Sequence, residues 1–158
     1  MVQLLAGSRL FHGIDPKALE GLVQELPAQT AAPGQRVVQE GEVAGSMFIV
    51  LGGELEVLKK GQNGDETRLA FLGPGDWFGE MAVLDVQPRS ASIVAVAPSL
   101  LLRLSEVDVD RLLYRREVAQ YARFMRNLAR ELSRRLRVAD GLLASATDLA
   151  REYSKHAQ

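Results

Sequence analysis

The stretch Met47–Val57, which reads MFIVLGGELEV, decides the fold. Its first five residues form a continuous apolar run, which is typical of a strand buried on both faces. After two glycines, Leu55 and Val57 alternate with Glu54 and Glu56, as expected for a strand with one face in solvent. The stretch therefore predicts two β-strands joined by a tight glycine turn.

The same pattern extends outward from this stretch, from residue 28 to residue 104. Short β-prone runs alternate there with turns that contain glycine, and this spacing predicts an all-β roll or barrel. Residues 1–27 are expected to form a helical cover, with a helix that starts at Asp15-Pro16 and stops at Pro27. From Ser105 the pattern stays helical to the end, so residues 105–158 are expected to form the C-terminal helices.

Composition limits what this domain can be. The 158 residues, 47% of them apolar and 25% charged, suffice for one buried core with an appendage. Because the chain has no cysteine, we expect a reducing cytoplasm and neither disulfides nor thiolate metal sites. No apolar run is long enough to span a membrane. The sequence also lacks nucleotide-hydrolysis loops, serine-nucleophile elbows and metal-ligand clusters, so we expect neither an enzyme nor a metal site.

A short motif marks the candidate site. Residues 78–84 read FGEMAVL and, after three residues, residues 88–91 read PRSA. The motif places the Glu80 carboxylate and the Arg89 guanidinium at the two ends of a short helical turn that is entered through Gly79. A ligand with a hydroxyl group and a phosphate suits this arrangement, because the carboxylate accepts from the hydroxyl while the guanidinium and the helix N-terminal amides hold the phosphate. A cyclic nucleotide has this chemistry; an ion pair that only closes the turn is the alternative.

The C-terminal helical segment carries a heptad seam. Its apolar residues are spaced alternately four and three positions apart, which keeps them on one face of a supercoiled helix. The seam consists of Leu132, Leu136, Ala139, Leu143, Ala146 and Ala150. This repeat predicts a parallel homodimer through the seam, and the alternative is a single amphipathic helix packed on its own domain.

Charge is unevenly distributed, although the formal net charge is −1. Residues 1–104 carry 8 basic and 12 acidic side chains, whereas residues 105–158 carry 11 basic and 8 acidic ones. The arginines concentrate between Arg115 and Arg137. We interpret this run as a solvated helical face and expect no nucleic-acid partner. Nucleic-acid binding is the alternative, and it would show as salt-dependent retention on heparin.

Together these features resemble the cyclic nucleotide-binding domain family, the β-roll module of the catabolite activator protein, of protein kinase regulatory subunits and of nucleotide-gated channels. The resemblance covers nearly the whole chain. It includes the stretch Phe48–Val57, the phosphate-binding cassette from Gly79 to Ala91, and a glycine framework made of Gly34, Gly41, Gly45, Gly53 and Gly75. It implies a mainly β fold, an antiparallel double-stranded, jelly-roll-like β-roll with N-terminal helices and a long C-terminal helix.

The resemblance also implies roles for the cassette residues. Glu80 would accept a hydrogen bond from the ribose 2′-hydroxyl, and Arg89 would pair with the cyclic phosphate. The other cassette residues expected to contact the ligand are Gly79, Met81, Ala82, Ser90 and Ala91. Transcription-factor members carry a helix-turn-helix domain after the dimerising helix, whereas only eight residues follow Ala150 here. Met1 and the compact length favour a free-standing sensor over a fragment of a larger protein.

Asp140 bears on which nucleotide binds. If residues 132–140 align with the dimerising helix of the transcription-factor members, Ala139 and Asp140 replace hydroxyl residues that contact adenine. Alanine has no side-chain hydrogen bond to offer, while a carboxylate accepts from the adenine amino group or accepts two bonds from guanine. We expect cAMP, with cGMP as the alternative; an exposed Asp140 without a role at the base is equally open.

The sequence thus predicts a cytoplasmic receptor for a cyclic mononucleotide that signals by repositioning its C-terminal helix toward a partner protein. The alternative is a dimerisation or scaffold module of the same fold, which binds no mononucleotide or binds a cyclic dinucleotide.

Overall fold

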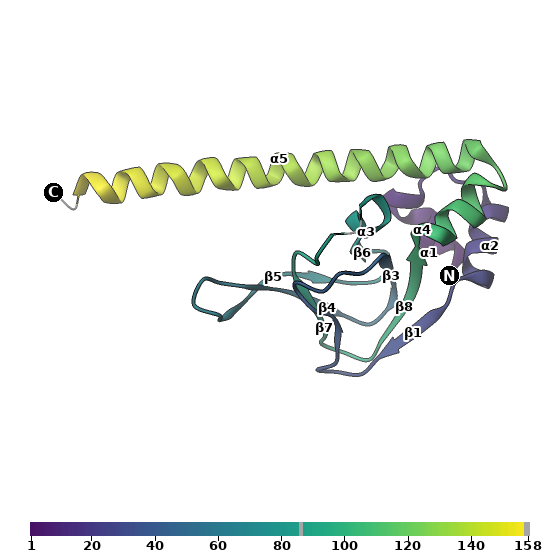
Figure 1. Cartoon of the computed structure of the whole chain (residues 1–158), viewed down its shortest axis with the longest axis horizontal. Helices are drawn as coiled ribbons and strands as arrows, with labels where there is room; N and C mark the ends of the chain where they lie inside the picture. Colours follow the sequence, from purple (N-terminus) through teal and green to yellow (C-terminus); the bar gives the residue numbers. More distant parts are fainter. Residues whose placement is uncertain (86, 157–158) are drawn as a thin grey trace.

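Two antiparallel four-stranded sheets form the body of the molecule (Figure 1). A computed structural model of the chain describes residues 1–85 and 87–156. One sheet has the order β1-β8-β3-β6 and consists of Ala28–Ala31, Ser99–Ser105, Ser46–Gly52 and Trp77–Phe78. The other has the order β2-β7-β4-β5 and consists of Arg36–Val38, Ser92–Ala95, Leu55–Lys60 and Glu66–Leu72. The predicted β-roll with flanking helices is confirmed.

The apolar run that opens the diagnostic stretch becomes β3, and both of its faces are buried. Phe48 and Val50 point into the apolar cluster between the two sheets. Met47 and Ile49 point the other way, into a second cluster that the sheet shares with the helices. A strand between two apolar layers has no solvent face, which explains why this run does not alternate with polar residues.

Helices at the start of the chain cover one sheet. They are α1 (Val2–Gly7), the 3₁₀ helix η1 (Arg9–Phe11) and α2 (Pro16–Glu25). The helix start expected at Asp15-Pro16 is present, since Pro16 is the first residue of α2 and the Asp15 carboxylate accepts a hydrogen bond from the Lys17 amide at 2.8 Å. Their apolar residues complete the second cluster, in which Leu10, Phe11 and Leu19 are fully buried.

The C-terminal region is helical, as predicted, but it contains a break that the sequence analysis did not predict. It consists of α4 (Glu106–Val109), a π-helical turn η2 (Asp110–Tyr114) and α5 (Val118–His156), with a non-helical turn between η2 and α5. Leu112 and Leu113 of η2 are buried, as are Phe124 and Leu128 of α5. The turn reverses the chain, and both segments can then pack their apolar residues on the N-terminal helices.

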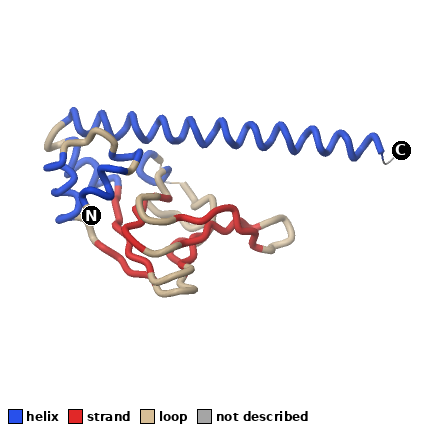
Figure 2. The backbone as a smooth tube through the Cα atoms, turned by 180° about the vertical axis from the view of Figure 1, so that it is seen from behind, coloured by secondary structure: helices blue, strands red, loops and turns tan. Residues whose placement is uncertain are grey.

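α5 runs along one side of the roll and continues past its body (Figures 1 and 2). Its first part is anchored: Phe124 is fully buried with its ring centroid 5.7 Å from that of Phe11. The Asn127 amide donates to the carbonyl oxygens of Leu10 and His12 at 3.0 and 2.9 Å. From Ser133 to Glu152 every side chain is exposed. In the part of the chain described by the structure, neither α5 nor any other helix has the length and hydropathy to cross a membrane.

Candidate functional site

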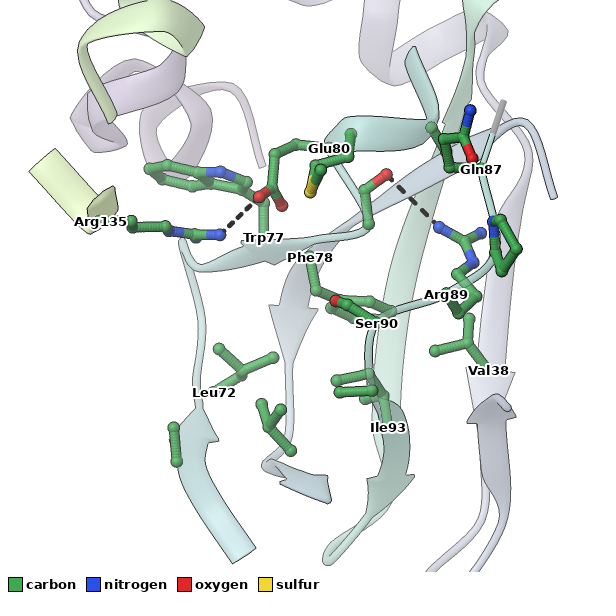
Figure 3. A pocket seen from close by; sticks show the side chains of 17 residues that line it. Val38, Leu72, Trp77, Phe78, Glu80, Gln87, Arg89, Ser90, Ile93 and Arg135 are labelled. Carbon is green, nitrogen blue, oxygen red and sulfur yellow. Dashed lines mark hydrogen bonds and ion pairs between the residues drawn. The ribbon is translucent and has the colours of Figure 1, made fainter. Parts of the chain in front are cut away.

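A cavity of about 370 Å³ opens between the cassette, one β-sheet and α5 (Figure 3). Its floor is apolar and consists of side chains from strands β2, β4, β5 and β7, including Val38, Leu72 and Ile93. Its rim comes from the cassette, which contains the short helix α3 (Met81–Leu84). The structure brings all seven predicted cassette residues to this cavity: Gly79, Glu80, Met81, Ala82, Arg89, Ser90 and Ala91.

Arg89 is a buried cation in this cavity. The residue is only 8% exposed. Its Nη2 donates to the Ser46 carbonyl oxygen at 2.6 Å and its Nη1 to that of Gly79 at 3.4 Å, while its Nε has no partner among the described residues. Burial lowers the pKa of the Arg89 guanidinium, against the opposing effect of Glu42 and Glu80. Within the described residues no carboxylate lies within ion-pair distance of Arg89. The site thus holds a positive charge that an anionic ligand would neutralise.

Gly79 is required where the chain enters the cassette. Its φ is +74°, in the left-handed region that favours glycine. A methyl group at this position would overlap the Arg89 guanidinium and come within 3.2 Å of the Ser46 carbonyl oxygen. Gly79 therefore permits both the turn and the close approach of the arginine to the backbone.

Glu80 lies at the other end of the cavity from Arg89 and pairs with α5. The residue is 6% exposed, and its Oε1 accepts a hydrogen bond from Arg135 Nη1 at 2.7 Å (Figure 3). The Arg135 guanidinium also lies over the Trp77 ring, 5.7 Å from the ring centroid. An ion pair between Glu80 and Arg89, the alternative weighed from the sequence, is not what the structure contains: the carboxylate pairs with a different arginine.

The cassette is held in place by hydrogen bonds to neighbouring segments. The Arg89 amide donates to the Glu42 carbonyl oxygen at 2.8 Å, and the Gly41 amide donates to that of Arg89 at 2.9 Å. The Lys59 ammonium of β4 donates to the Ser90 carbonyl oxygen at 2.7 Å. These bonds fix the backbone around Arg89 before any ligand arrives, which reduces the entropy lost on binding.

Asp140 does not reach this cavity. It is exposed on α5, five positions after Arg135, and a helix turns by about 140° over that distance. Arg135, in contrast, lines the cavity although we interpreted the arginine run as a solvated face. Trp77 is a second residue that sequence reasoning missed. The only sequence signal for Arg135 is its position on the helix that follows the roll, which does not distinguish it from the neighbouring arginines.

The seam residues lie on the outer part of α5. Leu136 is 63% exposed and Leu143 is 68% exposed, so these apolar side chains have no cover within the described chain. Leu132, at the start of the seam, is partly buried against the helical cluster. No group of three or more potential metal-ligating side chains occurs within the described ranges.

The fold and the cavity define a class of protein: a β-roll whose apolar cavity contains a buried arginine. The family model of the cyclic nucleotide-binding domain matches residues 28–116. The chain is 35% identical over 136 residues to the cyclic AMP receptor protein of Thermus thermophilus, covering 86% of this chain and 61% of the relative. It is 30% identical over 144 residues to the CRP-like cAMP-activated global transcriptional regulator of Mycobacterium tuberculosis, covering 91% of this chain and 62% of the relative.

A solved structure agrees with these sequence relatives. The Thermus thermophilus catabolite activator protein superposes with a TM-score of 0.79 at 35% identity, over 89% of this chain and 63% of that one. This chain belongs to the cyclic nucleotide-binding domain family. It spans about three-fifths of the length of the relatives named above.

Proposed function

We propose that this chain is a cytoplasmic receptor for a cyclic mononucleotide, with cAMP preferred over cGMP, and that it binds its ligand without chemical conversion. The observation that carries the proposal is the buried Arg89 guanidinium, which has no carboxylate partner among the described residues and opens into an apolar cavity. A cyclic phosphate carries one negative charge and can accept two parallel hydrogen bonds from a guanidinium. The names of two relatives, which specify cAMP, support the preference.

Each cassette residue has a proposed role. Arg89 pairs with the phosphate, and Glu80 accepts from the ribose 2′-hydroxyl through the oxygen that Arg135 leaves unoccupied. Gly79, Met81, Ala82, Ser90 and Ala91 line the ligand. Asp140 lies outside the cavity of its own chain, so the proposal places its carboxylate near the base bound by a second copy.

Calorimetric titration tests the proposal most directly. Purified protein is titrated with cAMP, with cGMP and with a cyclic dinucleotide. We expect cAMP to bind with a dissociation constant on the order of 1 µM or below and cGMP to bind more weakly. Tighter binding of cGMP would reverse the assigned preference. If only the cyclic dinucleotide binds, or if none of the three ligands binds, the receptor hypothesis is wrong. The alternative, a dimerisation or scaffold module, would then be the preferred function.

The contact between Glu80 and Arg135 suggests how binding is transmitted. A ribose hydroxyl that approaches the Glu80 carboxylate changes the environment of Arg135, which is the α5 side chain that lines the cavity among the described residues. If the ligand favours one position of α5 over another, binding shifts the population toward that position. The proposed output is this new position of α5, which a partner protein would recognise.

Replacing Arg135 with alanine is expected to uncouple binding from this output. The phosphate contact at Arg89 remains, so cAMP affinity should stay within about tenfold of the wild-type value. The change in hydrogen exchange of α5 on adding cAMP should be lost, because the side chain that links α5 to the cassette is gone. Arg137→Ala, which removes an arginine bonded to Ser133 on the same helix, is the matched control and should keep the change. Equal exchange changes in both variants would contradict this mechanism.

We further propose a parallel homodimer through the seam of Leu132, Leu136, Ala139, Leu143, Ala146 and Ala150. The exposure of Leu136 and Leu143 supports it, since pairing would bury these side chains.

The double substitution Leu136→Glu and Leu143→Glu should shift the protein to monomers, because pairing of the two helices would then bury negative charges against each other. Sedimentation velocity at several protein concentrations measures this, with at least about a tenfold weaker association expected. Ser145→Glu adds one negative charge on a face of α5 about 140° from the seam and should not affect association. A wild-type protein that remains monomeric at high concentration would exclude the homodimer.

A further inference from the structure

A second cavity, of about 660 Å³, lies beside the nucleotide pocket. Its walls come from α1, η1, the loop before β6 and α5. Leu72, Trp77 and Arg135 line both cavities, so the two are neighbours that share a wall. Figure 3 shows Trp77 and Arg135 at the edge of the first pocket, where this wall begins. The role proposed above for the first pocket makes no use of the second.

Three arginines give this second cavity many hydrogen-bond donors. They are Arg9 of η1 and Arg134 and Arg135 of α5. Each guanidinium carries five N–H groups. Arg134 uses its Nε for a bond to Glu131 at 3.1 Å, and Arg135 uses Nη1 for Glu80. Arg9 approaches Glu131 only to 3.6 Å, beyond hydrogen-bond distance. Most of these N–H groups therefore have no protein acceptor among the described residues and face solvent, since the side chains of Arg9, Arg134 and Arg135 are 67%, 48% and 42% exposed.

The two carboxylates that line the cavity, those of Glu131 and Asp76, are partly occupied. Both carboxylate oxygens of Glu131 already face arginines, at 3.6 and 3.1 Å. The other carboxylate, that of Asp76, accepts from the Gly73 amide at 2.9 Å. The Ser8 hydroxyl and the Trp77 indole N–H also lack partners among the described residues, but both atoms are buried and are not counted as donors to the cavity. The second cavity thus has a surplus of donors and a shortage of acceptors.

We propose that this second cavity binds a small polyvalent oxyanion, a molecule with several phosphate or carboxylate oxygens. Such a ligand supplies the missing acceptors, and guanidinium groups bind planar carboxylates and phosphates through paired N–H···O bonds. The site is distinct from the nucleotide pocket, since Arg9 and Arg134 belong to it and do not line the first cavity. Arg135 lines both cavities, so the proposed nucleotide and the proposed oxyanion would bind on either side of this residue.

Titration calorimetry of the Arg89→Ala variant tests this inference without any nucleotide, because the variant lacks the arginine of the first pocket. Inorganic pyrophosphate and citrate serve as probes, and they distinguish phosphate from carboxylate ligands. We expect saturable binding of at least one probe with a stoichiometry of one. Adding Arg9→Ala and Arg134→Ala should weaken that binding at least about tenfold, while adding Arg137→Ala, on α5 but outside the cavity, should leave it unchanged.

Absence of saturable binding by both probes, or an equal loss in the Arg137→Ala control, would overturn the inference. If circular dichroism shows that Arg89→Ala does not fold, the same titrations are made in the wild-type background. In that background, only the part of the binding that is lost on substitution of Arg9 and Arg134 is assigned to the second cavity. This experiment uses no cyclic nucleotide, so its result is independent of the proposed receptor function. If neither probe binds, the receptor proposal is unaffected. If cAMP does not bind, the proposal of an oxyanion site is unaffected.

Discussion

Replacement of Arg89 by methionine is expected to weaken cAMP binding by about 100-fold or more. The guanidinium is the cation that faces the proposed phosphate position, and hydrogen bonds to charged groups contribute about 1.5–3 kcal/mol each. Loss of two such bonds corresponds to a factor of about 100 or more in the dissociation constant. Methionine fills similar space with an unbranched apolar chain, so the cavity wall is kept. Calorimetric titration with cAMP measures the loss.

The same substitution should leave the fold intact. Burial without a carboxylate partner disfavours the charged form, as the lowered pKa of Arg89 indicates. Removing that charge offsets the loss of its bonds to Ser46 and Gly79, so the midpoint of thermal unfolding without ligand should stay within about 3 °C of the wild-type value. Arg103→Met, at an exposed position of β8, is the control for charge removal and should bind cAMP normally. Wild-type affinity in Arg89→Met would refute the assigned phosphate site.

Replacement of Phe124 by alanine is expected to lower the free energy of unfolding by about 3–5 kcal/mol. Phe124 is fully buried and packs on Phe11, where α5 meets the N-terminal helices. Its removal leaves a cavity between elements that are far apart in sequence, and the surrounding helices can close it only partly. Urea denaturation followed by circular dichroism gives the difference.

A matched control comes from the exposed part of the same helix. Leu142 is 68% exposed, so Leu142→Ala should change the free energy of unfolding by less than about 0.5 kcal/mol. A Phe124→Ala loss below about 1 kcal/mol, compared with typical core substitutions, would mean that α5 is not anchored at this point.

Much of the roll could be predicted because its signals are local. Strand β3 follows from a continuous apolar run and β4 from alternation, and both depend only on residues that are adjacent in sequence. Glu80 and Arg89 were found from a local motif, which spans thirteen positions from Gly79 to Ala91, and the family resemblance added the other five cassette residues. The position of each residue in the cavity follows once the roll closes.

The contribution of α5 could not be predicted from local patterns. Arg135 and Glu80 are 55 positions apart, and the contact depends on how the turn after η2 directs the helix. That turn was missed because helical spacing on both sides conceals a short break. Asp140 was predicted to contact the ligand on the basis of an assumed alignment. It lies five positions after Arg135, which puts it on a different face of the helix.

If α5 is repositioned on binding as proposed, the way it is anchored would make it a lever. Its 39 residues extend about 58 Å, and packing holds only the part near Phe124 and Leu128. If the pivot lies near Arg135, a tilt of about 10° would move the end of the helix, about 32 Å away, by roughly 5 Å. A tilt of this size would move the distal end by about one helical turn, which is the kind of change that the proposed partner protein would recognise.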